Sequence, residues 1–223
     1  NAPFIVLDDA DIDEAVKGAM IAKLRNGGAA CTAANRFYVS KKVAAQFTEK
    51  LTAAMADIKM ASGLTEGAQL GASVSVKERN KIADLVTASI SQGAELKLGG
   101  KTPDGDGAFY PPTVLTVAAD NEILKEEIFG PVAVIVTVDS DEQAIALAND
   151  TEYGLISYIY SADLGRALKV AEAMESGMVA INRGVISDPA APFGGYKQSG
   201  LGREGGFDGV HEFLEKKYIG AAF

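Results

Sequence analysis

The sequence predicts an α/β fold with a mostly parallel sheet that helices cover on both faces. Short apolar segments of strand length alternate with helical segments of about ten or more residues, which is typical of crossover connections between parallel strands. The 223 residues, 48% of them hydrophobic, are enough to bury one substantial core. No linker and no internal repeat divides the sequence, so one continuous layered structure is expected.

The first half of the chain begins with a short apolar strand over 4–7. A helix follows from Asp11 to about Arg25, because Asp11 and an acidic residue three places later resemble a capping box. Its apolar face is imperfect and is interrupted by Lys23, and Asn26-Gly27-Gly28 supplies the stop. The other elements expected in this half are a strand over 36–39, helices over 43–58 and 76–90, and short strands over 95–98 and 113–117.

The second half of the chain alternates more regularly. The polar, glycine-rich stretch from Gly99 to Gly107 is expected to be a surface loop. The elements expected after it are strands over 132–138, 155–160 and 178–181 and helices over 141–149 and 163–175.

Composition excludes several classes of function. The chain has 21 basic and 30 acidic side chains, a net charge of −9, which disfavours binding to nucleic acid or to anionic lipid. The longest apolar run, over 132–138, is far shorter than the roughly 20 residues of a membrane-spanning helix. One cysteine and one histidine are too few for an internal disulfide or an ordinary zinc site. We therefore expect a cytoplasmic protein without a metal.

The start of the sequence shows no secretory signal pattern. It has no initiator Met, and an apolar, strand-like segment begins only three residues in. These two features lead us to expect that the chain was cut from something longer.

Cys31 is the first candidate for chemistry. It follows a run of small residues over 26–30, which allows another molecule to approach the backbone and leaves amide groups free to face an oxyanion. A thiolate at this position could attack a carbonyl carbon. A free cysteine is more often a small core residue, however, and spacing alone leaves both interpretations open.

Three separated segments resemble motifs of the aldehyde dehydrogenase family, and they occur in the family's order. They are Leu24–Arg36 around Cys31, Lys125–Pro131 with the letters KEEIFGP, and Pro192–Glu204 with the letters PFGGYKQSGLGRE. By this resemblance the chain is identified as a member of that family, most similar to its succinate-semialdehyde dehydrogenases. The resemblance implies a catalytic domain over 1–203 and a C-terminal helix and strand over 204–223 that serve oligomerisation.

The resemblance also implies a mechanism and a cofactor, NAD or NADP. Cys31 would add to the aldehyde, its own backbone amide would help to hold the oxyanion, and hydride would pass to the nicotinamide before the thioester is hydrolysed. Glu127 would accept hydrogen bonds from the nicotinamide ribose, and Phe129 would pack near the nicotinamide ring. Without the family, Glu127 would be interpreted as one more solvated acid.

The chain departs from the family pattern in two ways. Ala29 replaces the usual Gln of the cysteine motif, and Leu24 replaces an aromatic residue. In the family, the general-base glutamate, one oxyanion donor and the dinucleotide-binding domain all precede the position of Asn1. The resemblance therefore implies that an absent N-terminal domain binds most of the cofactor, and we expect the isolated chain to be inactive.

Arg25 and Ser187 are the candidate substrate residues. Arg25 lies six residues before Cys31, where a cation would suit a carboxylate on the substrate, although it could equally complement the helix dipole. In succinate-semialdehyde dehydrogenases an arginine at this offset and a serine in the loop corresponding to 184–187 bind the substrate carboxylate. The resemblance thus implies these two roles, and Phe193 would form an aromatic wall of the tunnel.

Two other interpretations of function stay open. One is a different aldehyde dehydrogenase, such as a glutarate-semialdehyde or broad-range enzyme, and the other is a catalytically silent folded fragment. A small-molecule aldehyde is the expected partner, and the family resemblance predicts a homo-oligomer, a dimer or tetramer, through the strand-like segment 217–221.

Three further features have limited roles. Ala33 stands where some relatives carry a second cysteine, which excludes a disulfide switch there, and His211 is expected to be a surface residue. The letters GLGREG over 200–205 match a Rossmann fingerprint by chance, because we expect no strand over 192–199 and no acidic ribose ligand at the required distance.

Overall fold

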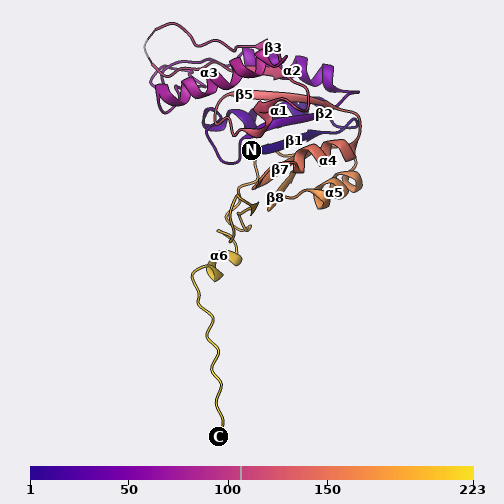
Figure 1. Ribbon diagram of the computed structural model, residues 1–223, viewed down its shortest axis with the longest axis vertical. Helices are drawn as coiled ribbons and strands as arrows, with labels where there is room; N and C mark the ends of the chain where they lie inside the picture. The colour runs from indigo at the N-terminus through magenta and orange to yellow at the C-terminus, as the bar shows by residue number, and fades with distance from the viewer. Residues whose placement is uncertain (106) are drawn as a thin grey trace.

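The computed structural model describes residues 1–105 and 107–223 and contains a seven-stranded sheet. Helices lie on both sides of this sheet (Figure 1). The strand order is β3-β4-β5-β2-β1-β7-β8. Every pair of neighbours is parallel except β3 and β4, which are antiparallel. The strands are β1 (Ala2–Val6), β2 (Ala34–Ser40), β3 (Glu95–Leu98), β4 (Thr113–Thr116), β5 (Val132–Val138), β7 (Ile156–Tyr160) and β8 (Met178–Ile181).

Five helices cover the two faces of this sheet. One apolar core joins the sheet to α1 (Ile12–Leu24) and α2 (Ala44–Ala56). A second core joins its other face to α3 (Val76–Ser91), α4 (Asp141–Asn149) and α5 (Leu164–Ala173). The predicted α/β class, with helices on both faces of a mostly parallel sheet, is confirmed. No helix in the described ranges has both the length and the apolar character needed to cross a bilayer.

Local sequence signals account for the helix starts. The Asp11 carboxylate accepts hydrogen bonds from the backbone N–H groups of Asp13 and Glu14 at the start of α1. Ser75, Ser140 and Asp163 cap α3, α4 and α5 in the same way. The strands and helices predicted between residues 4 and 181 all occur, with boundaries within about two residues, the usual uncertainty of a helix or strand end.

Four short elements lie outside the prediction. They are the 3₁₀ helices η1 (Arg25–Gly28) and η2 (Glu122–Lys125) and the two paired strands β6 (Tyr153–Gly154) and β9 (Tyr196–Lys197). The C-terminal helix expected within 204–223 is present as α6 (Asp208–His211). The expectation that 192–199 contains no strand is wrong for two residues. Gly154 donates its backbone N–H to the Ser199 hydroxyl at 3.0 Å, and this contact holds β9 beside β6. The pairing is non-local, so the sequence pattern of either segment gives no sign of it.

The described part of the Gly99–Gly107 stretch is a loop, exposed over 101–105 and at Gly107. Position 106 of that prediction lies outside the described residues. Beyond α6 the chain runs away from the α/β body as an extended tail (Figure 1). Residues 217–221 pair with no strand in the described chain, so their pairing with another subunit stays a prediction, as does the boundary at 203.

Candidate active site

The loop that carries Cys31 lies between η1 and β2, at the edge of the sheet where the parallel strands β1 and β2 begin. Asn26, Gly27 and Gly28 have φ values of 53°, 64° and 80°, so three successive residues adopt the left-handed conformation and turn the chain sharply. The Asn26 side-chain amide donates to the Ala29 carbonyl at 2.7 Å. The residues predicted to end the helix, Asn26 to Gly28, therefore also form the turn that leads to Cys31.

Cys31 is exposed on a turn closed by a 2.9 Å hydrogen bond from Ala33 N–H to the Ala30 carbonyl. The Tyr158 hydroxyl donates a 2.7 Å hydrogen bond to the carbonyl of Thr32, the residue after the cysteine. Within residues 1–105 and 107–223, the Cys31 N–H donates to no acceptor. The thiol and a free backbone donor are therefore presented together, which is the arrangement that an oxyanion requires.

The segment with Glu127 and Phe129 packs directly against the cysteine loop. A Cβ on Gly28 would lie 2.2 Å from the Gly130 carbonyl oxygen, so the two backbones touch and only glycine fits. Glu127 is half-buried, whereas the Phe129 ring is 41% exposed and its φ is 55°. A bulky residue at positive φ carries backbone strain, and here it accompanies an unpacked aromatic ring beside the cysteine loop.

A cavity of about 440 Å³ opens between these two loops and the segment 70–74. Asn26, Gly27 and Ala29 line it from the cysteine loop and Phe129 from the other. Tyr110 also lines it, and its buried hydroxyl has no hydrogen-bond partner in the described structure. Burial raises the pKa of Tyr110 to about 12. The exposed Phe129 ring on the wall of this cavity and the half-buried Glu127 carboxylate in the same loop fit one edge of a nucleotide cofactor with a planar ring and ribose hydroxyls.

Lys23 lies buried beneath the cysteine loop, on the last turn of α1. Its side chain is 0% exposed, and its amine donates a 2.6 Å hydrogen bond to the Asn35 side-chain oxygen. Burial lowers the pKa of Lys23 to about 7, and the Glu127 carboxylate opposes that shift. A side chain that interrupted the apolar pattern of the helix is thus a buried, titratable amine next to the candidate site.

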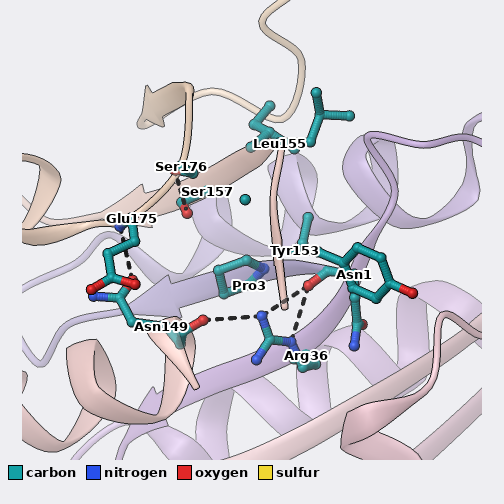
Figure 2. A pocket seen from close by; sticks show the side chains of 13 residues that line it. Asn1, Pro3, Arg36, Asn149, Tyr153, Leu155, Ser157, Glu175 and Ser176 are labelled. Carbon is teal, nitrogen blue, oxygen red and sulfur yellow. Dashed lines mark hydrogen bonds between the residues drawn. The ribbon is translucent and has the colours of Figure 1, made fainter. Parts of the chain in front are cut away.

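Arg36 lies near the start of β2, just after the cysteine loop, and stabilises this end of the sheet by hydrogen bonds (Figure 2). It is 2% exposed, and its guanidinium donates to the carbonyls of Asn1, Leu147 and Ala148 at distances from 2.9 to 3.2 Å. These bonds tie the start of β1 to the C-terminal end of α4. The small pocket drawn in Figure 2 lies next to these Arg36 hydrogen bonds. Its volume of about 10 Å³ has room for one water molecule, so it is too small to be a substrate site.

Arg25 is exposed immediately after α1. Burial raises the pKa of Tyr158 to about 12, while Arg25 lowers it and Cys31 raises it, so both groups lie within electrostatic range of one hydroxyl. No ion pair engages Arg25 in the described part of the chain. The guanidinium is therefore free for an anion near Cys31, although its position at a helix C-terminus also suits the dipole.

Ser187 and Phe193 share an open depression of about 420 Å³ with Glu204. Their loop reaches α1, because a Cβ on Gly184 would lie 2.3 Å from the Gly18 carbonyl oxygen. Ser187 is exposed and Phe193 half-buried, and no hydrogen bond joins Ser187 to Arg25 in the described residues. The structure thus packs the Glu127 loop against the loop that carries Cys31 and follows Arg25, whereas neither Arg25 nor Cys31 lines the depression that holds Ser187 and Phe193.

Sequence reasoning missed Tyr158, Tyr110 and the Lys23–Asn35 pair. Lys23 gave a visible signal as the charged interruption of an apolar face, whereas the two tyrosines sit in ordinary apolar segments. His211 is exposed within α6. Among residues 1–105 and 107–223, no three His, Cys, Asp or Glu side chains gather in a metal-binding group.

The fold and the loop geometry define an α/β domain with a mostly parallel sheet, which presents an exposed cysteine at the end of the sheet where β1 and β2 begin. The chain belongs to the aldehyde dehydrogenase family, whose model matches residues 1–219. It is 52% identical over its whole length to a succinate-semialdehyde dehydrogenase of Paenarthrobacter nicotinovorans, of which it covers 50%. Over 98% of its length it is 48% identical to a glutarate-semialdehyde dehydrogenase of Pseudomonas putida, of which it covers 45%.

A solved structure gives the same result for the fold. The crystal structure of an Escherichia coli NADP-dependent enzyme matches 98% of this chain with a TM-score of 0.95 and 45% identity, and the match covers 46% of that protein. The chain therefore spans about half the length of the relatives that it matches.

Proposed function

We propose that this chain supplies the nucleophile half of an NAD(P)-dependent aldehyde dehydrogenase that oxidises succinate semialdehyde to succinate. The observation that carries the proposal is the exposed Cys31 on a fixed turn, with its own N–H free. Membership of the family supports the reaction class, and relatives named for semialdehydes support the substrate. The complete gene product is called the full-length enzyme below.

In the proposed reaction, the Cys31 thiolate attacks the aldehyde carbon and forms a thiohemiacetal, a covalent step that divides one difficult oxidation into two easier ones. The free N–H of Cys31 donates to the oxyanion that develops. When bound, the nicotinamide supplies a hydride acceptor. Glu127 accepts hydrogen bonds from ribose hydroxyls, and Phe129 packs against the ring, so that the carbon of the thiohemiacetal faces the acceptor. Hydrolysis of the resulting thioester frees Cys31.

For substrate selection, Arg25 binds the distal carboxylate of the aldehyde by charge-assisted hydrogen bonds, with Ser187 as a second donor. Phe193 forms the aromatic wall. A glutarate-semialdehyde substrate is the second candidate, because a relative of 48% identity carries that name. The two substrates differ by one methylene group, which a pocket discriminates by only about 1–3 kcal/mol.

The described residues offer one edge of a dinucleotide site, so the proposed enzyme needs a dinucleotide-binding half outside this chain. That half also supplies the general base for thioester hydrolysis. The extended segment after α6 joins subunits of a homo-oligomer by adding a strand to a partner sheet. The single cysteine fits a reducing, cytoplasmic location.

The test measures NADH and NADPH formation by the full-length enzyme with succinate semialdehyde, glutarate semialdehyde and an uncharged aldehyde. We expect turnover that favours succinate semialdehyde, together with its loss in Cys31→Ser. The 223-residue chain alone should form neither product, because proximity of cofactor and thiohemiacetal is lost. Sustained turnover by the isolated chain would contradict the division of the site, and no turnover by the full-length enzyme would contradict the proposed function.

A further inference from the structure

Lys23 is a fully buried amine that the proposed reaction does not use. An ammonium group has three donors, and the structure gives this one a single hydrogen-bond acceptor, the Asn35 side-chain oxygen at 2.6 Å. Asn35 itself is 2% exposed and lies at the start of β2, four residues after Cys31. A buried charge with so few partners is costly to keep, unless a counter-charge acts on it.

The counter-charge comes from the neighbouring loop. Gly28 is wedged between the carbonyl of Lys23 and that of Gly130, with distances of 3.1 Å and 2.2 Å to the position of an added Cβ. The end of α1 and the loop that carries Glu127 are therefore packed together. Neither a hydrogen bond nor an ion pair joins the Lys23 amine to the Glu127 carboxylate in the described structure, so the attraction acts without direct contact.

Three other titratable groups, Asn1, Arg36 and Cys31, belong to the same electrostatic cluster as Lys23 and Glu127. In the 223-residue chain the terminal amine of Asn1 is a further titratable group, and burial lowers its pKa to about 6. Arg36 donates to carbonyl oxygens, and Cys31 lies on the solvent side. Glu127 is the charged group that acts on Lys23 itself. The half-buried carboxylate and the buried amine are thus within electrostatic range of each other.

We propose that Lys23, held by Asn35, is a positioning residue that orients the Glu127 carboxylate for binding the nicotinamide ribose. The inference rests on the proposed function of Glu127. It gives a reason for an amine in an otherwise apolar helix face, because the attraction of a nearby positive charge favours some orientations of the carboxylate over others. Since the pKa of Lys23 is about 7, the amine loses its charge near neutral pH, and the carboxylate loses its counter-charge.

The first test follows the amine itself in the 223-residue chain. With ¹³C-labelled lysine, the resonance that disappears in Lys23→Met reports the Lys23 side chain, and its titration midpoint is measured in the wild type and in Glu127→Gln. We expect a midpoint near 7 in the wild type and a lower one in Glu127→Gln, because removal of the carboxylate disfavours the ammonium form. An unchanged midpoint would overturn the pairing, whatever the enzyme's function.

The same titration has a consequence for stability. The folded-state pKa of Lys23 lies below its ordinary value of 10.5, so the unfolded chain binds a proton that the folded chain lacks between about pH 7 and 10.5. Stability should therefore rise with pH in this window in the wild type. Lys23→Met should remove that rise, and Lys17→Met, a change on the same helix at an exposed lysine, should retain it. The same unfolding measurements show whether Lys23→Met and Lys17→Met fold.

The second test measures dinucleotide affinity of the full-length enzyme between about pH 6 and 9. We expect the wild type to bind several-fold more weakly above pH 7, and Lys23→Met to bind weakly at every pH. Lys17→Met should follow the wild type. Equal, pH-dependent affinity in the wild type and Lys23→Met would overturn the positioning role. If no variant binds dinucleotide while the lysine midpoint still depends on Glu127, then the proposed function has failed and the pairing has not.

Discussion

The Tyr158 hydroxyl donates a 2.7 Å hydrogen bond to the carbonyl oxygen of Thr32, the residue that follows Cys31. Tyr158 lies in β7, 126 residues farther along the chain, and is 1% exposed. A strand from the second half of the chain thus holds the nucleophile loop of the first half. The position of the thiol depends on long-range packing as well as on its glycine-rich approach.

Tyr158→Phe should release this loop. We expect a loss of about 0.5–1.5 kcal/mol in the free energy of unfolding, measured by urea denaturation, because the Thr32 carbonyl loses its donor. Turnover by the full-length enzyme should fall by roughly tenfold, because the thiol is less well placed. Tyr160→Phe is the control, since Tyr160 lies in the same strand, is 3% exposed and makes no hydrogen bond through its hydroxyl in the described residues. Equal losses in the two variants would argue against a role for the Thr32 bond.

The close contact between Gly28 and Gly130 leads to a second prediction, which concerns the thermal stability of an alanine variant. Gly28 and Gly93 have φ values of 80° and 96°, so alanine at either position strains the backbone by about 1 kcal/mol. At Gly28 the new Cβ would also meet the Gly130 carbonyl at 2.2 Å, whereas nothing lies within 4 Å of it at Gly93. Gly28→Ala should therefore destabilise the chain more than Gly93→Ala in thermal unfolding. A similar loss for both would mean that the two loops separate without cost.

Asp8 predicts a pH dependence of stability. Its pKa is lowered from 3.8 to about 2, first by the hydrogen bond from Lys42 and then by the one from Arg166. A carboxyl group with a depressed folded pKa stabilises the fold above its unfolded pKa, and this contribution is lost as the pH falls from about 4 to 2. Asp8→Asn should remove about 1 kcal/mol of that acid-sensitive stability after solvent screening. Urea denaturation at several pH values measures it, and an unchanged acid profile would contradict the pairing.

Arg25 tests the substrate assignment. Arg25→Gln in the full-length enzyme should lower kcat/KM for succinate semialdehyde by roughly 10- to 100-fold, the loss of one charge-assisted interaction of about 1.5–3 kcal/mol. Uncharged aldehydes should be affected much less. Lys17→Gln changes the charge of the same helix at an exposed position and should affect neither substrate. If Arg25→Gln weakens both substrate types equally, the residue serves the helix end and not the substrate.

The sequence predicted the sheet, its five large helices and the cysteine loop because these depend on local patterns. Asp11 caps its own helix, and Asn26 to Gly28 turn the chain through their own positive φ values. The pairing of β6 with β9 and the Tyr158–Thr32 bond depend on segments that meet only after folding. In the sequence, Lys23 was visible as a charged residue within an apolar helix face. Only the structure shows that its amine is buried away from solvent. The site residues themselves stay predictions.

The central claim is that Cys31 forms the covalent intermediate, and mass spectrometry of the full-length enzyme tests it most directly. The enzyme is mixed with succinate semialdehyde and oxidised dinucleotide, quenched in acid during turnover and digested. We predict an acyl adduct, with the mass of the product acid less one water, on the peptide that contains Cys31, and no adduct in Cys31→Ser. Reduced dinucleotide formed at an undiminished rate by Cys31→Ser, or an adduct on another peptide, would contradict the account.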